Sequence, residues 1–587
     1  MSDLSFGQLS RFAHISLLDY EYNAAPGEPP DPLCLVVEDF RSGEQKRFWR
    51  DELRAMRRPP FPTGPNAVAI SFYAPAELSC MLADGLPLPD CVIDLFAEHR
   101  VATNGERLPL GNGLLGALAY RGLPHIESSA KEVLREKIMS QTVWPPEDRA
   151  EILNYCASDV AALRALFTAM LPTLDLPRAL MRGRYTKAVA HMERNGTPID
   201  ISVQNSFSEH WHLARRELVK TIDTDFGVYD GLHFRRGRFS EWLRVNRIPW
   251  PRTEHGTLKL DDDTFKEQSA IWPALKPLRE LRQALTSMHV PGLPVGKDGR
   301  NRTLLSPFAS KTGRNQPSAK RFVFGLPAWQ RGVVRPPEGW ALGYIDWSSQ
   351  EIAVAAGLSG DAGLIQAYEG GDPYLAFGKD AGVAPPSATR VSHPEIRNIC
   401  KTVMLGLNYG LGVERMAHQA GISPALAAEL IQRHRMTYSR YWQWSDGVVT
   451  RALLTNEMNS VFGWHRKIGP FDRPTSLMNF PMQANSAEMM RVAAIAAIEA
   501  DIIVCAPVHD AFLIAAPIDE IEAAVRQMRE IMSQAGYYVT GGVRVRTEAK
   551  IVRYPDRYMD ERGADMWNRV VRLIDRPDAV YGLSSVA

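Results

Sequence analysis

Short apolar runs separated by polar turns dominate the first part of the chain. The runs FAHISLLDYEY, PLCLVVEDF and NAVAISFYA are rich in strand-forming residues and are separated by stretches that contain Pro and Gly. Residues 147–174 instead carry apolar positions at helical spacing. This pattern predicts an α/β unit over residues 1–175.

Helical patterns and then two further strand patterns follow. Residues 178–290 are helical in pattern and basic, 300–345 are rich in Gly and Pro, and 361–460 are helical again. The runs WALGYID, at 340–346, and DIIVCAPVHDAFLIAAP, at 501–517, predict buried strands, and the second predicts a hairpin with His-Asp at its turn. We therefore expect an α/β protein of several domains.

Composition and charge exclude several classes of protein. The 587 residues include 68 Lys and Arg against 67 Asp and Glu, and 45% are hydrophobic. A net charge near zero excludes a uniformly basic surface but leaves room for a basic cleft. Six scattered cysteines without a C-x-x-C pair predict a reduced, cytoplasmic protein without structural zinc. We find no signal-peptide pattern and no run of about 18 apolar residues, so we expect no membrane span.

Two carboxylates stand at the ends of predicted strands. Asp346 ends the run WALGYID, and Asp510 lies at the turn of the predicted hairpin at 501–517. Alone, an acid after a strand is more typical of a helix N-cap than of a metal ligand. Two carboxylates brought together repel each other, and a pair of divalent ions relieves that repulsion. Such a pair can also hold the attacking and leaving oxygens of a phosphoryl displacement.

A helical segment between these acids, SHPEIRNICKTVMLGLNYG at 392–410, is a candidate anion site. Arg397, Lys401, Leu405 and Asn408 fall within about 80° on one helix face. Two cations one turn apart near a helix N-terminus suit a polyphosphate. For any single helix, a solvated face of Arg and Lys is the alternative interpretation.

Acidic residues also follow the first strand of the N-terminal unit. Asp19 and Glu21 form a D-x-E pattern, Asp94 follows the run CVI, and Tyr155 and Asp159 form a Y-x-x-x-D pattern on the predicted helix. A lone D-x-E carries little information, because acids are common at strand ends. Four carboxylates and a tyrosine together could hold two metal ions and orient an attacking water.

Taken together, these motifs resemble known families. Three of them are similar, in order and internal spacing, to motifs A, B and C of family A DNA polymerases: Asp346 with Glu351, Arg397-x-x-x-Lys401 with Tyr409-Gly410, and Val508-His509-Asp510. The likeness is to the DNA polymerase I type, and in particular to its compact bacteriophage versions. The N-terminal constellation resembles the DEDDy 3′–5′ exonuclease domain that precedes such polymerases.

The resemblance implies a fold and a domain order. A ribonuclease H-like exonuclease domain at 1–175 would precede a right-hand polymerase domain. In that domain the thumb would span 178–300, the fingers 361–460, and the palm 301–360 together with 461–587.

The resemblance also implies a function. The chain would be a DNA-directed DNA polymerase that adds dNTPs to a primer 3′ end by two-metal phosphoryl transfer. Its 3′–5′ exodeoxyribonuclease activity would proofread, and the whole would serve phage genome replication in the bacterial host cytoplasm. The partners would be primer–template DNA and dNTPs, and the protein would be a monomer. Each site would hold two Mg²⁺ ions, with Mn²⁺ able to substitute.

Residue roles follow from the same resemblance. The metal ligands would be Asp346 and Asp510 at the polymerase site and Asp19, Glu21, Asp94 and Asp159 at the exonuclease site, where Tyr155 would orient the water. Arg397 and Lys401 would bind the β- and γ-phosphates, and Lys401 would protonate the pyrophosphate. Glu351 would exclude a ribose 2′-hydroxyl. The dNTP site would also include Leu405, Tyr409 and Tyr374, and DNA would be contacted by Arg314, Asn479, Gln483 and His509.

Several positions depart from the family pattern, among them Ser349-Gln350 and Ala353 in the first motif. Ala511 stands where the family has a glutamate after His-Asp, and Tyr374 takes the place of a triphosphate-contacting histidine. Leu405 replaces a Phe or Tyr, and in the family a tyrosine there supplies a hydroxyl that makes the enzyme tolerate dideoxynucleotides. These departures leave fidelity and nucleotide preference open.

Two rival functions share part of this pattern. A single-subunit RNA polymerase of phage type has the same three motifs, although Glu351 and the exonuclease constellation argue against it. A repair nuclease whose C-terminal half merely grips DNA is a rival of another class. Extension with dNTPs or rNTPs separates the first, and primer extension by an Asp19→Ala variant separates the second.

Overall fold

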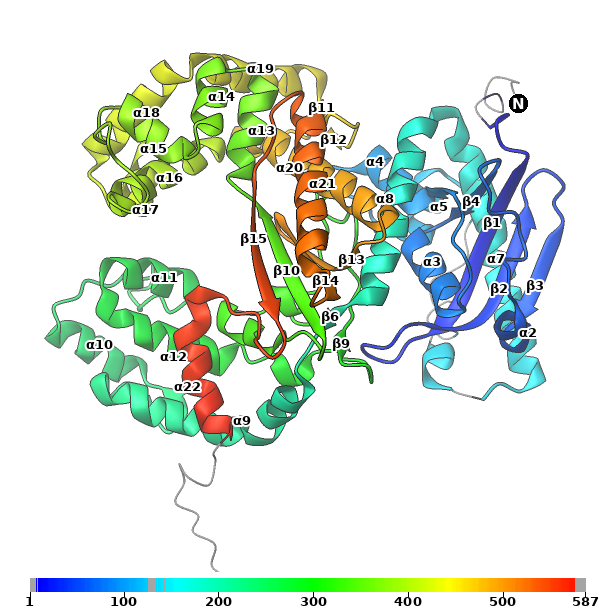
Figure 1. The fold of residues 1–587 in the computed structure, drawn as a ribbon, viewed down its shortest axis with the longest axis horizontal. Coiled ribbons are helices and arrows are strands. Elements are labelled where there is room, and N and C mark those ends of the chain that lie inside the picture. The colour runs from blue at the N-terminus through cyan, green and yellow to red at the C-terminus, as the bar shows by residue number, and fades with distance from the viewer. Residues whose placement is uncertain (1–6, 8, 125–133, 135, 142, 576–587) are drawn as a thin grey trace, which may run out of the picture.

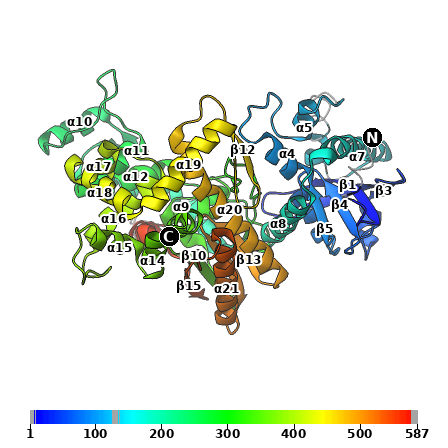
Figure 2. The ribbon, with the colours of Figure 1, turned by 90° about the horizontal axis from the view of Figure 1, so that it is seen from above.

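The computed structural model describes residues 7, 9–124, 134, 136–141 and 143–575. Two helical lobes and an N-terminal α/β unit surround a central sheet, as Figures 1 and 2 show. No helix within the described ranges combines the length and apolar character needed to cross a bilayer.

The N-terminal unit is a mixed sheet in the order β3-β2-β1-β4-β5, with β1 antiparallel to β2 and parallel to β4. Its strands are β1 (His14–Asn23), β2 (Asp31–Asp39), β3 (Gln45–Trp49), β4 (Ala67–Ser71) and β5 (Cys91–Asp94). Its helices are α2 (Arg50–Ala55), α3 (Ala74–Ala83), α4 (Leu95–Thr103), α5 (Leu114–Tyr120) and α7 (Pro146–Met170). The strands predicted from the first three apolar runs and the helix predicted at 147–174 are confirmed.

Strand alternation explains how this sheet is covered on both faces. Ile15 and Leu17 of β1 belong to one buried cluster, and Leu18 and Tyr20 belong to another. Because successive side chains of a strand point to opposite faces, one strand supplies two cores. Helix α7 packs against β1 and β2 within the first cluster. Asp19 and Glu21 therefore lie in the second half of a strand that is packed on both faces.

Helix α8 (Leu176–Asn195) joins the N-terminal unit to the rest of the molecule. It packs against α3 and β5 of that unit and against α20 and β13 of the central region. Gly183 of α8 lies directly on the carbonyl of Val92 in β5, where a Cβ would have no room. The helix thereby approaches the strand closely, and the two units share a continuous buried boundary.

The central sheet carries the candidate acids. Its order is β13-β14-β10-β15, with all neighbours antiparallel. The strands are β10 (Trp340–Trp347), β13 (Ile503–Val508), β14 (Ala511–Pro517) and β15 (Thr547–Arg553), and α20 (Pro474–Glu499) and α21 (Ile521–Thr540) pack on them. The strand predicted at 340–346 and the hairpin predicted at 501–517 are both confirmed.

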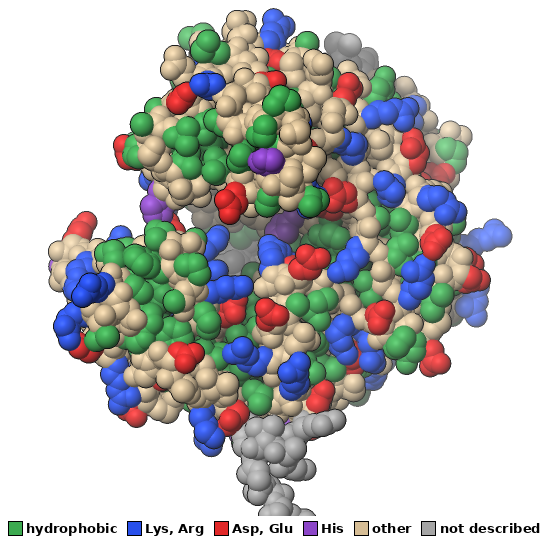
Figure 3. Space-filling view, turned by 60° about the vertical axis from the view of Figure 1, so that its left-hand side comes forward, with side chains coloured by type: hydrophobic (Ala, Val, Ile, Leu, Met, Phe, Trp, Pro, Cys, Tyr) green, Lys and Arg blue, Asp and Glu red, His purple; other side chains and the backbone are tan. Residues whose placement is uncertain are grey.

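Two helical lobes flank a hollow beside this sheet. One lobe contains α13 (Gln350–Ser359), α14 (Ala362–Glu369), α15 (Pro373–Asp380), α16 (Pro394–Asn408), α17 (Val413–Ala420), α18 (Pro424–Thr437) and α19 (Ser439–Thr455). The other contains α9 (Ile201–Ile222), α10 (Arg236–Val245), α11 (Asp262–Ile271), α12 (Lys276–Thr286) and α22 (Ala564–Asp575). Figure 3 shows the hollow between the lobes, with both basic and acidic side chains along its rim.

Short strand pairs complete the architecture. They are β6 (Thr197–Pro198) with β9 (Arg300–Asn301), β7 (Tyr229–Asp230) with β8 (His233–Phe234), and β11 (Glu457–Asn459) with β12 (His465–Lys467). Helix α22 packs against α9, so the last described helix returns to the lobe that begins after α8.

Candidate active sites

The two strand-end acids of the central sheet lie side by side. Asp346 is in register with Ala511 on β14 and with Glu548 on β15. The backbone N–H of Trp347 donates to the carbonyl of Asp510 at 3.1 Å, which places Asp510 at the same edge. Burial, followed by the charges of Asp510 and Glu548, raises the pKa of Asp346 to about 7. A half-buried group of carboxylates with this excess of negative charge suits divalent cations.

Glu548 is a residue that the sequence motifs miss. It lies in the stretch RTEAKI, which matches no motif. Only the register of β10 with β15 places it opposite Asp346, and in an antiparallel pair such residues share a face of the sheet. The site therefore has a third acid near Asp346, although Ala511 stands where the family that the motifs resemble has a glutamate.

Arg314 and His509 lie next to these acids. The Arg314 guanidinium is 3.6 Å from Oδ1 of Asp510. His509 is exposed at the hairpin turn and has a left-handed backbone with φ of 53°. Both residues line a cavity of about 500 Å³, together with Tyr185 and Arg491. The cavity opens beside the carboxylate edge and has basic side chains in its wall.

The cations predicted on α16 share an aromatic neighbour. The guanidinium of Arg397 lies 5.3 Å and the ammonium of Lys401 6.0 Å from the centre of the Tyr374 ring. Arg397 also forms an ion pair with Asp372, which caps α15 by accepting from the N–H of Tyr374 at 3.1 Å. Leu405 follows on the same helix and is half-buried. Asp372 belongs to none of the sequence motifs, and an Asp at a helix start is common.

This helix faces the acidic edge of the sheet. The positive charge of Lys401 acts on Asp346 and partly offsets the rise in its pKa. The charge of Arg314 acts in the same sense on Glu351 at the start of α13. Cations from two separate segments therefore surround the carboxylates, which is the arrangement that a bound polyphosphate with divalent ions needs.

Glu351 is held by two side chains from other elements. Its Oε1 accepts hydrogen bonds from the Tyr409 hydroxyl at 2.8 Å and from Nε2 of Gln483 at 2.9 Å. Nε2 of Gln483 also lies 2.7 Å from the Tyr409 hydroxyl, and Asn479 donates to the carbonyl of Asn408 at 3.5 Å. Burial raises the pKa of Glu351. These contacts fix one carboxylate between α13, α16 and α20.

A second acidic cluster lies in the N-terminal unit. Carboxylate oxygens of Asp19, Glu21 and Asp159 all lie within 4.8 Å of one another, so one ion could contact all three. Tyr155 lies one helical turn before Asp159 on α7. Burial and then the negative charges of Asp159, Glu21 and Asp19 raise the pKa of Tyr155. The tyrosine hydroxyl therefore stays neutral and can donate a hydrogen bond to the acids beside it.

Asp94 has a different position from the other predicted exonuclease acids. Its Oδ1 accepts from the N–H groups of Tyr73 at 2.9 Å and Phe96 at 3.0 Å and caps α4, and the side chain is buried. Among the described residues it is outside the three-acid group. Burial raises the pKa of Asp94 to about 7. The structure thus brings three of the four acids together and leaves the fourth as a helix cap.

The N-terminal cluster opens onto a large cavity. This cavity has a volume of about 820 Å³, and its wall includes Glu21, Tyr155, Glu193, Arg302 and Arg321. Basic side chains from the segment after α12 thus face acids of the N-terminal unit across one cavity. A polyanionic chain with its end at the acids would fit this distribution of charge.

Comparisons with known proteins cover most of the chain. Residues 322–553 match the family model described as DNA polymerase family A. The chain is 24% identical over 378 residues to "DNA polymerase I, thermostable" of Thermus thermophilus, which is 60% of this chain and 45% of that protein. It therefore spans about half the length of these bacterial relatives.

Phage proteins and a solved structure extend the comparison. The chain is 24% identical over 431 residues to the DNA polymerase of Mycobacterium phage L5, covering 69% of this chain and 68% of that one. It also matches the POL domain of Pol1 from M. smegmatis, solved in complex with DNA primer-template and dNTP, with a TM-score of 0.69. That match has 19% sequence identity and covers 93% of this chain and 96% of the other, so the two share a fold.

Proposed function

We propose that the chain is a template-directed DNA polymerase that extends a primer 3′ end with dNTPs, because residues 322–553 match the family model described as DNA polymerase family A. The observation that carries the proposal is the pairing of Asp346 and Asp510 at one sheet edge, inside the matched region. Lys401 of α16 acts on the same carboxylate from the facing lobe. Acids and cations so arranged are what phosphoryl transfer from a triphosphate requires.

The polymerase chemistry is assigned to residues of this edge. Asp346 and Asp510 would hold two Mg²⁺ ions, or Mn²⁺ in their place, and these ions supply Lewis-acid stabilisation of the attacking and leaving oxygens. Arg397 and Lys401 would bind the β- and γ-phosphates by charge-assisted hydrogen bonds. Lys401 would also give a proton to the pyrophosphate as it leaves.

The sugar, base and DNA contacts are assigned to the surrounding residues. Glu351, fixed by Tyr409 and Gln483, would stand against the 2′ position and exclude a ribose hydroxyl. Leu405 and Tyr374 would line the dNTP site. Arg314, His509, Asn479 and Gln483 would contact primer–template DNA.

We assign a second activity, 3′–5′ proofreading exonuclease, to the N-terminal unit. The three-acid group and the adjoining cavity of about 820 Å³ support it. Asp19, Glu21 and Asp159 would hold metal ions, and Tyr155 would orient the attacking water. Asp94, the fourth acid of the predicted set, caps α4 outside this group. The likeness to mycobacteriophage polymerases supports a role in phage genome replication.

The domain assignment is the one that the order of the sequence motifs implies. We propose an exonuclease domain at 1–175 and a thumb at 178–300. The fingers would span 361–460, and the palm 301–360 and 461–587. The hollow between the two helical lobes would then accept the duplex, with Lys and Arg side chains meeting its phosphates.

Primer extension tests the polymerase assignment. We expect the wild-type chain to extend a primed template with four dNTPs and Mg²⁺, and EDTA to stop it. Asp346→Asn or Asp510→Asn should lower the extension rate by more than the roughly 10–100-fold that loss of a second-shell partner costs, because each removes a ligand itself. Degradation of a single-stranded 3′ end should persist. Extension by either variant at a near wild-type rate would show that the metal assignment is wrong.

A further inference from the structure

Arg314 sits at the end of a tight loop, residues 308–314, which we call the arginine loop. Within the loop, the N–H of Arg314 donates to Oγ of Ser310 at 2.7 Å and the N–H of Gly313 donates to the carbonyl of Ser310 at 3.0 Å. Gly313 has φ of 73°, and Phe308, which is not a glycine, has φ of 60°. Left-handed non-glycine residues persist only where their surroundings hold them. The direction in which the Arg314 side chain points therefore depends on the residues that contact the loop.

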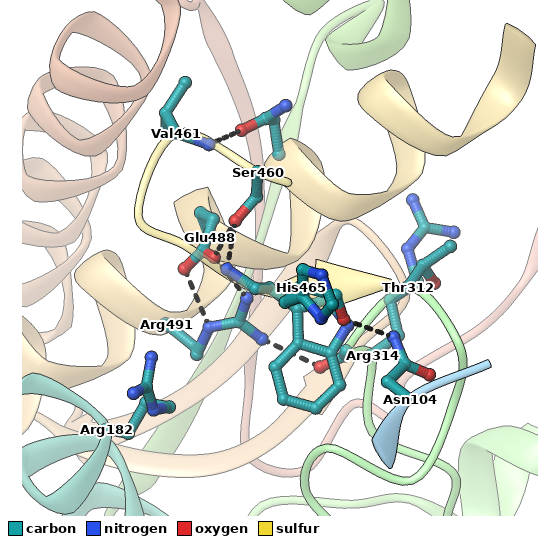
Figure 4. Close-up of polar contacts among 12 residues, drawn as sticks. Asn104, Arg182, Thr312, Arg314, Ser460, Val461, His465, Glu488 and Arg491 are labelled. Atoms are coloured by element: carbon teal, nitrogen blue, oxygen red, sulfur yellow. Dashed lines mark hydrogen bonds and ion pairs between the residues drawn. The ribbon is translucent and has the colours of Figure 1, made fainter. Parts of the chain in front are cut away.

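One set of contacts to the arginine loop comes from the central region. Nε1 of Trp464 donates to the carbonyl of Lys311 at 3.0 Å, and the guanidinium of Arg491 donates to the carbonyl of Gly313 at 2.8 Å. Arg491 is itself paired with Glu488 at 2.9 Å, and both side chains are buried. Figure 4 shows this buried pair beside the loop that ends at Arg314.

A second set of contacts to the arginine loop comes from α4 of the N-terminal unit and the residue that follows it. Nδ2 of Asn104, a side chain with no exposed surface, donates to the carbonyls of Lys311 at 2.7 Å and His465 at 2.8 Å. Arg100, one helical turn earlier, donates to the carbonyls of Phe308 at 3.3 Å and Ala309 at 3.2 Å. Two side chains of the N-terminal unit thus hold three carbonyls of the arginine loop, including that of Phe308, its left-handed residue that is not a glycine.

We propose that Asn104 and Arg100 are positioning residues of the polymerase site. They hold the arginine loop from the N-terminal unit, so that Arg314 stays aimed at Asp510, 3.6 Å away. The inference rests on the proposed polymerase function. It gives the N-terminal unit a part in primer extension that is independent of the three-acid group in the same unit.

The geometry favours this role over simple docking of two units. Asn104 lies where α4 ends. Its side-chain amide bridges the arginine loop and His465, the first residue of β12. Its backbone carbonyl also accepts from the N–H of Lys467 at 2.8 Å. The following residue, Gly105, has φ of 100° and lies against the Lys467 carbonyl, where a Cβ has no room. The backbone of Asn104 and Gly105 is therefore fixed against Lys467, and this fixes the position of the Asn104 side-chain amide relative to the loop.

A double-mutant cycle tests the proposal in the full-length chain. If Asn104 acts through Arg314, Asn104→Ala should lower kcat for primer extension about tenfold, because a small misplacement of a positioned group can cost up to about a hundredfold. The KM for dNTP should change by less than about twofold. In the Arg314→Ala background, Asn104→Ala should cost less than about twofold more, since coupled residues are not additive.

Glu106→Gln is the matched control. Glu106 lies two residues from Asn104 in the same interface, but its side chain pairs with Lys467 and Tyr120 rather than with the arginine loop. We expect its extension rate to equal that of the wild type. Degradation of single-stranded DNA should be unchanged in both Asn104→Ala and Glu106→Gln.

Three outcomes would overturn the inference. One is an Asn104→Ala effect of equal size with and without Arg314, and another is an equal loss in Glu106→Gln. If Asn104→Ala does not fold, Arg100→Lys takes its place, because lysine keeps the charge and loses the planar guanidinium. Arg100→Lys should then lower kcat as a single substitution but not when it is added to Arg314→Ala. An unchanged kcat in Arg100→Lys is the third. A wild-type chain that does not extend primers would instead refute the proposed function.

Discussion

The Glu351 carboxylate shows how one side chain is fixed by residues from different parts of the chain. Tyr409 and Gln483 both reach its Oε1, and they come from the end of α16 and from α20. Each hydrogen bond to a carboxylate contributes about 1.5–3 kcal/mol, so the side chain has little freedom to move away. A rigid group of this kind can exclude a substituent by steric clash.

This position leads to a prediction on sugar selection. Glu351→Ala should raise the rNTP/dNTP ratio of kcat/KM by at least about tenfold, because removing bulk from a packed site admits a larger substrate. Glu351→Gln keeps the bulk and should stay near the wild-type ratio. Single-nucleotide insertion with matched ribo- and deoxynucleotides measures this ratio of kcat/KM for each variant. A Glu351→Ala ratio equal to that of the wild type would place the selectivity elsewhere.

Glu193 gives a prediction on pH. It lies in the wall of the large cavity, accepts from the N–H of Leu305 at 2.7 Å, and burial raises its pKa to about 8. In the unfolded chain the group ionises near pH 4.5, so between these values the folded state binds the extra proton. Stability from this group is therefore complete below pH 4.5 and is lost as the pH rises to 8, by at most about 1.4 kcal/mol per pH unit.

The test compares Glu193→Gln with the wild type by thermal or urea unfolding from pH 5 to 9. The glutamine oxygen can still accept from Leu305, and the amide has no charge to bury. We expect the variant to gain stability relative to the wild type as the pH rises, with the gain levelling off above pH 8. A difference that is constant with pH would contradict the assignment.

At the scale of elements, α16 presents a row of side chains whose spacing is set by the helix. Arg397 and Lys401 lie one turn apart over Tyr374, and Leu405 follows one turn later. Because side chains four residues apart stack on one face, a group placed at 405 lies beside the cations that would hold the phosphates. The chemistry at this position is thus decided by the register of the helix.

Replacing Leu405 tests that register. A dNTP can use its own 3′-hydroxyl to help orient its phosphates, and a dideoxynucleotide lacks it. We expect the wild-type chain to discriminate strongly against dideoxynucleotides and Leu405→Tyr to relax this at least several-fold, since one hydrogen bond is worth about 0.5–1.5 kcal/mol. Leu405→Phe, with a similar ring and no hydroxyl, should not. Equal discrimination by the Tyr and Phe variants would mean that residue 405 does not face the sugar.

At the scale of the whole molecule, the two acidic clusters lie in different units. One cluster is on β1 and α7 and the other on the central sheet, with α8 packed between the two sheets. The segment after α12 borders both cavities: Arg321 lines the larger and Arg314 the smaller. The ligands at each cluster are nonetheless supplied by separate strands and helices.

Separate ligands predict separable activities. The double variant Asp19→Ala/Glu21→Ala should lower 3′–5′ degradation of a mismatched primer by at least about a hundredfold, since it removes two of three clustered carboxylates. Extension of a matched primer should stay within about twofold of the wild type, and the error rate should rise. Asp346→Asn is the reciprocal control. Unchanged degradation in the double variant would refute the exonuclease assignment.

The amino-acid sequence by itself determined the regular elements and most candidate site residues. The strands around Asp19, Asp346 and Asp510 and the helix at 147–174 were predictable, because burial on one or two faces imposes a local period on apolar residues. The cations of α16 were predictable for the same reason, since a helix fixes which residues share a face.

Tertiary structure alone decided which residues join these candidates. Glu548 meets Asp346 through strand register, and Asp372 meets Arg397 through the packing of α15 on α16. Asn104 meets the arginine loop across 207 positions of sequence. Periodicity is a local property of the chain, whereas register and contacts between units depend on distant partners whose spacing leaves no local pattern. For that reason the acids and cations could be read in order along the chain, and the residues that hold them in place could not.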